Sequence, residues 1–328
     1  MTILLDIAMF LVGLVAIVKG ADWLTDGSAA IAEKFGIPSL VVGLTIVAIG
    51  SSMPEFVVSV TAALDGNSDI ALGNIVGSNI FNILGIMGIT AMVTPIKVEK
   101  SNVRYDVPFI VLAAVAILIT TMDTFLDGPD QVNRISRSDG LMLLCVFLIF
   151  MVYTLSLTKK EFQSDSTQSA HPTFKGGLGG LRCLALVIVG LAALIFGGNW
   201  LVEGASGIAS ALGISEAVIA LTIVSAGTSA PELAASVMAA HKGDTAMALG
   251  NVVGSNVFNA FFILGAAATI TPVGAQGMRL YDFMALLISA VLLWVLCKFG
   301  KTYYTLTRAE GALLAILAAA YYVGCVML

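Results

Sequence analysis

Two short strings in the chain place a glutamate directly after a proline and close behind a pair of hydroxyls. "GSSMPE" occupies residues 50–55 and "GTSAPE" occupies residues 227–232. In a helix, side chains three and four residues apart share a face, so two hydroxyls should lie beside each carboxylate: Ser51 and Ser52 with Glu55, and Thr228 and Ser229 with Glu232. Each proline also lacks the N–H that would bond the carbonyl four residues back. Each helix should therefore kink or break there and free a backbone oxygen.

A second pair of strings supplies more oxygen atoms. "DIALGNIVGSNIFN" (69–82) and "AMALGNVVGSNVFN" (246–259) each carry a serine and an asparagine four residues apart, on one helix face: Ser78 with Asn82, and Ser255 with Asn259. Assembled together, the strings offer carboxylates, hydroxyls and carbonyls but no thiol or imidazole. These are the ligands of a hard cation such as calcium or sodium. The strings therefore predict a cation site.

Each residue alone has a plainer interpretation. A serine in a membrane helix often bonds back to its own backbone, small residues often permit close packing, and a lone proline is usually a kink. A glutamate at membrane depth is costly and is by default a candidate for function. Because the glutamate recurs with its proline and its hydroxyls, the cation site is favoured over these alternatives.

The composition indicates a protein of the lipid bilayer. Of the 328 residues, 58% are hydrophobic and 11% are charged, and the mean hydropathy is +0.98, which is more apolar surface than a soluble domain can bury. The four cysteines are scattered singly, without zinc or disulfide spacing. We expect no cofactor, no nucleic-acid partner and a single chain working alone.

Ten apolar stretches are long enough to cross a membrane. They lie near residues 3–24, 38–64, 69–92, 106–122, 140–158, 181–203, 215–240, 245–269, 281–297 and 310–327. The N-terminal run has no basic segment before it and no cleavage site after it, so we expect a retained first helix. The polar segment 159–180 divides the ten stretches into five and five.

The distribution of basic residues predicts the orientation. With the N-terminus outside, the cytoplasmic loops hold twelve Lys and Arg residues, whereas the outer loops hold only Arg134, Arg137 and Arg279. We therefore expect both termini outside the cell membrane and the loop 159–180 in the cytoplasm. Lys19 falls inside the first span and is expected to extend toward the interface or to pair with Asp22.

The chain contains an internal duplication. A shift of 177 residues aligns "GIPSLVVGLTIVAIGSSMPE" (36–55) with "GISEAVIALTIVSAGTSAPE" (213–232), and it aligns the two asparagine-rich strings without a gap. A repeat unit of five helices is odd, so the second copy should enter the membrane inverted. Inverted repeats place substrate sites near the midplane, on interrupted helices. We expect an all-α membrane protein of ten helices, with helices 2 and 7 broken at Pro54 and Pro231.

These paired strings resemble the two alpha-repeats of the sodium/calcium exchanger family, a branch of the calcium/cation antiporters. The matching regions are 36–82, within a first five-helix repeat at 1–158, and 213–259, within a second at 181–328. The short loop 159–180 leaves no room for a folded regulatory domain, so the resemblance is to a minimal prokaryotic-type member. It implies Na⁺ and Ca²⁺ as transported ions, an outward N-terminus and alternating access by sliding of the first and sixth helices.

The resemblance also implies roles for particular residues. Glu55 and Glu232 would be the central ligands, and Ser51, Ser52, Thr228 and Ser229 would add hydroxyls. Ser78 and Ser255 would line flanking sodium sites, Asn82 would face the centre, and the carbonyls of Ala48 and Ser225 would contribute. Asn259 departs from the pattern, because many relatives carry aspartate there. That difference leaves the stoichiometry and the proton sensitivity open.

Three alternatives to Na⁺/Ca²⁺ exchange remain at this point. A proton/calcium antiporter would protonate the two glutamates, but it would gain nothing from the flanking hydroxyls. A cation channel should carry oxygen rings along its whole length, whereas these polar groups cluster at one depth. An intramembrane enzyme is disfavoured because neither His171 nor His241 is placed to activate a serine and no metalloprotease motif is present.

Overall fold

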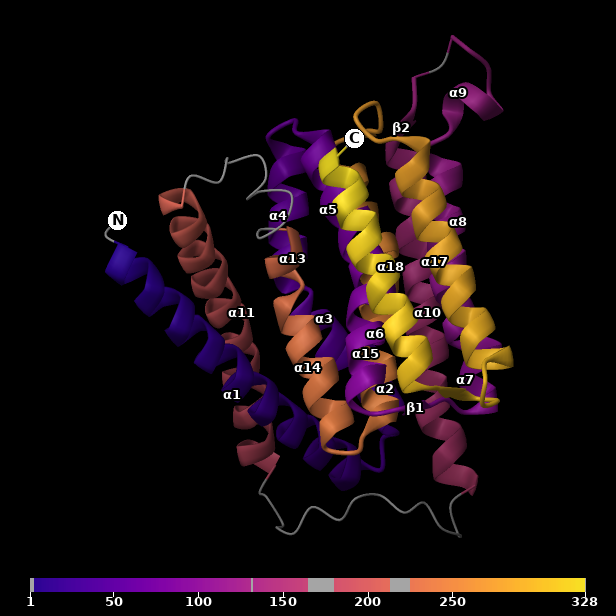
Figure 1. Ribbon diagram of the computed structural model, residues 1–328. Coiled ribbons are helices and arrows are strands. Elements are labelled where there is room, and N and C mark those ends of the chain that lie inside the picture. The colour runs from indigo at the N-terminus through magenta and orange to yellow at the C-terminus, as the bar shows by residue number, and fades with distance from the viewer. Residues whose placement is uncertain (1–2, 131, 165–179, 213–224, 328) are drawn as a thin grey trace.

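The computed structural model describes residues 3–130, 132–164, 180–212 and 225–327, and it is almost entirely helical (Figure 1). The exceptions in these ranges are two short antiparallel strand pairs. Strand β1 (Ile96–Lys97) pairs with β4 (Thr305–Leu306), and β2 (Arg134–Ile135) pairs with β3 (Val273–Gly274). The two pairs join loops at opposite ends of the helices (Figure 1).

Eight helices in the described residues are long and apolar enough to cross a membrane. Five of them are single or nearly continuous helices: α1 (Ile3–Phe35), α10 (Arg137–Ser164), α11 (Gly180–Ala211), α17 (Leu280–Phe299) and α18 (Arg308–Met327). A sixth combines α7 (Lys100–Tyr105) with α8 (Val107–Thr120), and a short helix, α9 (Asp123–Leu126), follows it. The chain is therefore a multi-pass membrane protein.

The remaining two of the eight form the core. One comprises α5 (Ser68–Ile80), a π-helical segment η2 (Phe81–Ile86) and α6 (Met87–Val93), and the other comprises α15 (Thr245–Val257), η4 (Phe258–Ile263) and α16 (Leu264–Ile270). In each of these two, protein buries 78% of the 18-residue apolar window, whereas the buried share of that window is 22–39% in the other six. Their small residues permit this burial: a Cβ on Gly250 would lie 2.5 Å from the carbonyl oxygen of Leu40.

A ninth span is made by a bent helix pair. It begins with α2 (Ser39–Val42), the π-helical segment η1 (Gly43–Val47) and α3 (Ala48–Ser51), and it continues after a 49° bend as α4 (Met53–Leu64). Pro54 lies in the first turn of α4, where a missing N–H costs nothing because no intrahelical acceptor exists for it. The stretch expected at 215–240 begins outside the described residues. Its described part is α13 (Ser225–Thr228) and α14 (Ala230–His241), interrupted at Ser229.

The sequence duplication extends to the element boundaries. A shift of 177 residues converts the bounds of α3, α4, α5, η2 and α6 into those of α13, α14, α15, η4 and α16. The turn after α4 and the turn after α14 both contain a glycine with positive φ, Gly66 at 77° and Gly243 at 89°. The same local conformations therefore recur in both halves.

Helices α1 and α11 form an antiparallel pair beside the core (Figure 1). Each carries three glycines spaced seven residues apart: Gly13, Gly20 and Gly27 on α1, and Gly190, Gly197 and Gly204 on α11. A Cβ on Gly13 would lie 2.5 Å from the backbone nitrogen of Leu201, and one on Gly190 would lie 2.6 Å from that of Leu24. The two backbones therefore touch along the pair, which only glycine permits.

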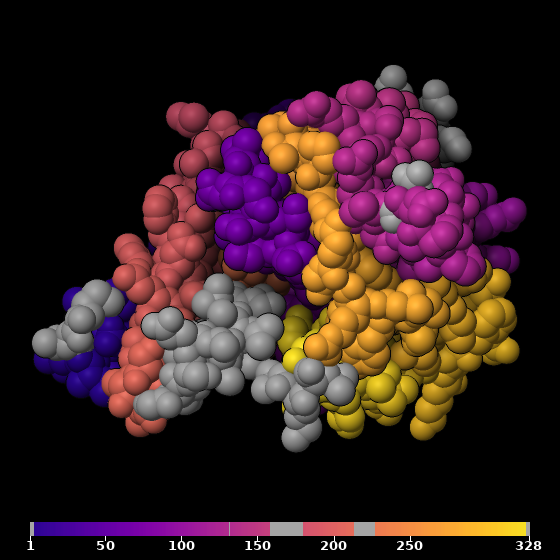
Figure 2. Space-filling view, turned by 90° about the horizontal axis from the view of Figure 1, so that it is seen from above, coloured from indigo at the N-terminus to yellow at the C-terminus, as the bar shows by residue number. Residues whose placement is uncertain are grey.

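Seen from above, α11 lies on one side of the turn between α4 and α5, and the β3–α17 segment lies on the other (Figure 2). Asp69, at the start of α5, accepts a hydrogen bond from the backbone nitrogen of Gly277 at 3.2 Å. This face is thus built by elements from both halves of the chain.

Candidate ion-binding site

The two glutamates of the repeated strings are buried in the core. Glu55, in the first turn of α4, and Glu232, in the first turn of α14, are each 1% exposed. Ser52 Oγ donates a hydrogen bond to Glu232 Oε1 at 2.7 Å, and Ser229 Oγ donates one to Glu55 Oε1 at 3.0 Å. Two reciprocal bonds therefore connect the halves, each from the serine of one repeat to the carboxylate of the other.

This arrangement corrects the expectation that each serine serves the glutamate of its own helix. The helix is interrupted at Ser52, and the following helix turns away by 49°. The side chains of Ser52 and Glu55 therefore do not share one continuous face, and Ser52 bonds the carboxylate opposite. Ser51 Oγ also reaches the other half and donates to Asn251 Oδ1 at 3.3 Å and to the carbonyl of Ala48 at 3.4 Å.

A pair of asparagines holds the backbone of both glutamates. Asn74 Nδ2 donates to Ser59 Oγ at 2.9 Å and to the carbonyl of Glu55 at 3.5 Å. Asn251 Nδ2 does the same with Ser236 Oγ at 2.8 Å and the carbonyl of Glu232 at 3.2 Å. The sequence interpretation missed these residues. Their identical place in "LGNIVGSN" and "LGNVVGSN" was the signal that could have revealed them.

The predicted asparagines Asn82 and Asn259 lie in the π-helical segments η2 and η4, at equivalent positions. Such segments are rare and often occur at functional sites. Asn259 Nδ2 donates to Asn79 Oδ1 at 3.1 Å, and Asn79 Nδ2 donates to the carbonyl of Asn256 at 3.4 Å. These two bonds connect the halves a second time.

Six oxygens of the predicted site residues are buried without a hydrogen-bond partner in the described structure. They form three pairs related by the repeat: Glu55 Oε2 and Glu232 Oε2, Ser78 Oγ and Ser255 Oγ, and Asn82 Oδ1 and Asn259 Oδ1. Buried polar atoms normally have partners, so each of these oxygens is free to accept a hydrogen bond or to bind an ion. An all-oxygen set of this kind fits a hard cation.

The other predicted ligands lie beside these residues. Ala48 is fully buried, and its carbonyl already accepts a hydrogen bond from the nitrogen of Ser52 at 3.1 Å. Ser225 begins α13 and Thr228 ends it. In the part of the chain that the structure describes, no group of three or more His, Cys, Asp or Glu side chains could hold a metal ion.

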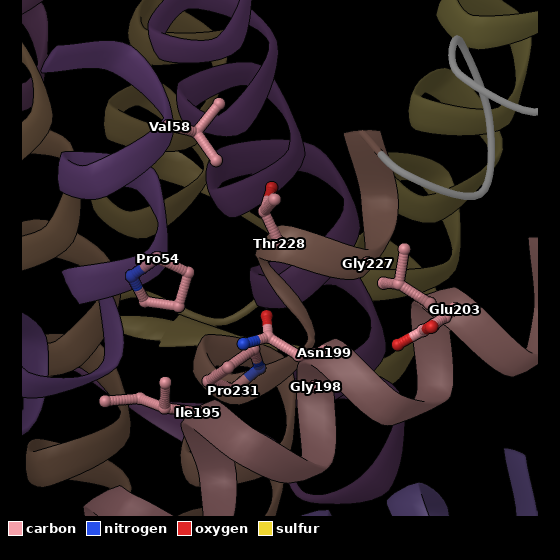
Figure 3. Close-up of a pocket in the computed structure, with 10 residues that line it drawn as sticks. Pro54, Val58, Ile195, Gly198, Asn199, Glu203, Gly227, Thr228 and Pro231 are labelled. Carbon is pink, nitrogen blue, oxygen red and sulfur yellow. The ribbon is translucent and has the colours of Figure 1, made fainter. Parts of the chain in front are cut away.

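A cavity of about 210 Å³ leads to these strings from one side (Figure 3). Its wall on α11 is formed by Ile195, Gly198, Asn199, Val202 and Glu203, and its opposite wall by Pro54, Val58, Gly227, Thr228 and Pro231. Because Thr228 lines it, the cavity connects the predicted ligands with the space between α11 and the core.

Buried, unpartnered oxygens on interrupted membrane-spanning helices are typical of one class of protein, the multi-pass transporters of cations. The model of the sodium/calcium exchanger protein family matches residues 5–156 and 183–327. The chain belongs to the sodium/calcium exchanger family.

Individual relatives can be aligned with nearly the whole chain. The chain is 36% identical over 316 residues to the putative antiporter CaxA of Alkalimonas amylolytica, covering 93% of each protein. It is 30% identical over 348 residues to the sodium/calcium exchanger MaX1 of Methanosarcina acetivorans, covering 98% of each. It is also similar to the solved structure of the sodium-calcium exchanger NCX_Mj soaked with 10 mM Na⁺ and zero Ca²⁺, with a TM-score of 0.79, 31% identity and coverage of 98% of this chain and 99% of that one.

Proposed function

We propose that this protein is a secondary active antiporter that exchanges Na⁺ for Ca²⁺ across the membrane by alternating access. The observation that carries the proposal is the set of six buried, unpartnered oxygens, arranged as three pairs across two halves of the chain. Membership of the sodium/calcium exchanger family supports the same function.

In this proposal Glu55 and Glu232 bind either ion. One Ca²⁺ or two Na⁺ balance the charge of two carboxylates, and closing the site around bare carboxylates would be costly in a low dielectric. The carrier therefore cannot change between its two conformations while the site is empty. The two ions compete for the same oxygens. Further ligands would be the hydroxyls of Ser51, Ser52, Thr228 and Ser229, the oxygens of Ser78, Ser255, Asn82 and Asn259, and the carbonyls of Ala48 and Ser225.

The proposed architecture has ten spans in two inverted five-helix repeats, 1–158 and 181–328, joined by a cytoplasmic loop at 159–180. The identical element bounds at an offset of 177, the antiparallel α1 and α11, and the reciprocal serine–glutamate bonds support it. The seventh span, expected at 215–240, would include α13 and α14, and the breaks proposed at Pro54 and Pro231 in the second and seventh spans would directly follow the interruptions at Ser52 and Ser229.

The proposed orientation places both termini outside the cell membrane. The start of α1 and the end of α18 lie at one end of the molecule, and the end of α10 and the start of α11 lie at the other (Figure 1). The excess of basic residues in loops at the second end supports a cytoplasmic location for it. We propose that a single chain is the working unit.

The test is calcium uptake into proteoliposomes loaded with sodium, with Glu55→Gln and Glu232→Gln measured alongside. We expect uptake that requires the sodium gradient and is lost in both variants, because each removes a central ligand charge. Asp130→Asn, in the acidic α9–β2 loop, serves as a matched control that should keep full uptake.

Sodium-free liposomes with a pH gradient form the second arm. Uptake driven by that gradient alone would replace sodium with protons as the counter-ion. Uptake that needs no counter-gradient, or that survives both glutamate substitutions, would contradict the antiporter mechanism at this site.

A further inference from the structure

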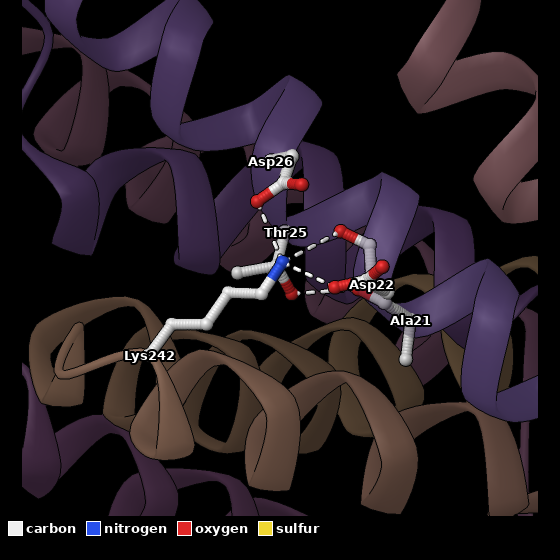
Figure 4. Close-up of polar contacts among 5 residues, drawn as sticks. All are labelled: Ala21, Asp22, Thr25, Asp26 and Lys242. Atoms are coloured by element: carbon white, nitrogen blue, oxygen red, sulfur yellow. Dashed lines mark hydrogen bonds and ion pairs between the residues drawn. The ribbon is translucent and has the colours of Figure 1, made fainter. Parts of the chain in front are cut away.

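An ion-pair cluster joins α1 to the turn between α14 and α15 (Figure 4). Lys242, directly after α14, places its Nζ 2.5 Å from Asp22 Oδ1 and 2.6 Å from Asp26 Oδ1. The same amine donates to the carbonyl of Asp22 at 3.1 Å. The side chains of Lys242, Asp22 and Asp26 are 21%, 34% and 31% exposed. They are partly shielded from solvent. Asp22 thus pairs with Lys242, across helices, instead of with Lys19 on its own helix.

The cluster lies on the side of the site away from the cavity. Helix α14 runs from Glu232 toward the end of the molecule at which α1 also ends (Figure 1). There α1 packs tightly against its neighbours, since Ala21 is 0% and Thr25 is 3% exposed. Their counterparts on α11, Gly198 and Val202, line the cavity (Figure 3). The α1–α11 pair therefore meets the core tightly through α1 and leaves open space beside α11.

The repeat shows that this ion pairing has no equivalent in the other half. At the offset of 177, Asp22 and Asp26 correspond to Asn199 and Glu203, and Lys242 corresponds to Asp65. Asp65 and Glu203 are exposed, and neither position supplies a cation. An arrangement with the roles of α1 and α11 exchanged would bring together two groups of like charge where the observed arrangement has a lysine between two aspartates.

We propose that Lys242, Asp22 and Asp26 form a one-sided latch that holds α1 against the core and biases the carrier toward the conformation with the cavity open beside α11. This inference rests on the proposed alternating access, in which the two arrangements exchange. Breaking the latch lowers the population of the observed conformation. Keeping a positive charge at position 242 preserves that population. Adding a lysine at position 65, the equivalent position in the other repeat, lowers it.

The test measures conformation directly, without ion transport. In a chain whose four cysteines are replaced by alanine, Ile195→Cys places a thiol on the α11 wall of the cavity, and its rate of reaction with a polar maleimide in detergent reports how open the cavity is. Lys242→Met should change the equilibrium constant between the two conformations roughly fivefold, the factor for about 1 kcal/mol from a partly exposed ion pair, and slow the reaction by up to that factor. The matched control Lys242→Arg should stay within about twofold of the parent.

Two more variants test the same charge pairing independently, in case Lys242→Met does not fold. The double substitution Asp22→Asn with Asp26→Asn should slow the reaction as Lys242→Met does, and Asp65→Lys should slow it by stabilising the opposite arrangement. Equal reaction rates in the parent, Lys242→Met and the double variant would overturn the latch. An equally slow Lys242→Arg would also overturn it, by showing that the shape of Lys242 matters and its charge does not.

The outcome is separable from that of the proposed function. If uptake does not depend on sodium but the maleimide reaction rates change as expected, the latch is supported and the assignment of the transported ions is wrong. Normal exchange without any rate change would remove the latch and leave the antiporter.

Discussion

At the scale of single residues, each half of the chain donates a hydrogen bond to the buried carboxylate of the other half. Ser52 bonds Glu232 and Ser229 bonds Glu55, so neither carboxylate is held only by its own repeat. Asn74 and Asn251 hold the backbones of the same glutamates from the following helices. One oxygen of each carboxylate is thereby fixed in place, and the other is left without a partner and available to an ion.

The reciprocal bonds lead to a prediction for the two serines. Ser52→Ala and Ser229→Ala should each raise the calcium concentration for half-maximal uptake by about tenfold or more, because a hydrogen bond to a charged group contributes roughly 1.5–3 kcal/mol. Concentration-dependent uptake in proteoliposomes measures the change. Ser101→Ala, at an exposed position, is the control. An unchanged half-saturating concentration in both variants would contradict the assignment of these bonds to the ion site.

The sequence predicted which residues lie together in the core better than it predicted the contacts between them. Spacing within a helix identified Glu55, Glu232 and their neighbouring hydroxyls, because the repeat marked them twice. It could not show that Ser52 reaches the opposite glutamate, since that contact depends on the bend after Ser51. Likewise, nothing local to Lys242 in the sequence indicates that it pairs with Asp22 and Asp26.

At the scale of elements, nine of the ten expected spans lie on helices of the described residues, counting the bent pair as one, and several outer helices are longer than expected. The first stretch, expected at 3–24, is α1 (Ile3–Phe35), because its less apolar second half packs on α11 and the core instead of lipid. The π-helical segments η2 and η4 were not predicted, since a single extra residue per turn leaves no trace in hydrophobic periodicity. The glycine spacing of α1 and α11 was visible in the sequence, but its meaning requires knowing that the two helices are partners.

The glycine contacts predict which face of α1 tolerates change. Gly20→Leu should lower the melting temperature in detergent and reduce calcium uptake, because even its Cβ would lie 2.8 Å from the carbonyl oxygen of Gly190. Overpacking of this kind typically costs about 1–3 kcal/mol. The control Val15→Leu lies on the lipid-facing side of the same helix, 62% exposed, and should leave both properties unchanged. Equal effects of the two substitutions would argue against backbone contact between α1 and α11.

At the scale of the whole molecule, an ion at the site should hold the two halves together. Its ligands would come from α3, α4, α5 and η2 in the first half and from α13, α14, α15 and η4 in the second, so binding should stabilise the folded chain as a unit. A ligand at about one hundred times its Kd adds about 2.7 kcal/mol to the free energy of unfolding. Calcium should therefore raise the melting temperature in detergent by several degrees.

The same measurement contains its own controls. Glu55→Gln should abolish the calcium-dependent rise, and magnesium should give a smaller rise, because Mg²⁺ demands a tighter octahedral geometry and gives up its water reluctantly. An equal rise with Mg²⁺, or a full rise in the Glu55→Gln variant, would place the stabilising ion somewhere other than between the two glutamates.

The length of the α1–α11 pair also concerns the surrounding lipid. Helices of 33 and 32 residues extend for about 50 Å, whereas the hydrocarbon core of a bilayer is only about 30 Å thick. Figure 1 shows α1 oblique to the core helices, which shortens its extent along their direction, and apolar side chains such as Leu4 and Val15 face outward. Any movement of these helices changes how much apolar surface matches the hydrocarbon, so acyl-chain length becomes a thermodynamic variable of the carrier, able to favour one conformation without touching a single ligand.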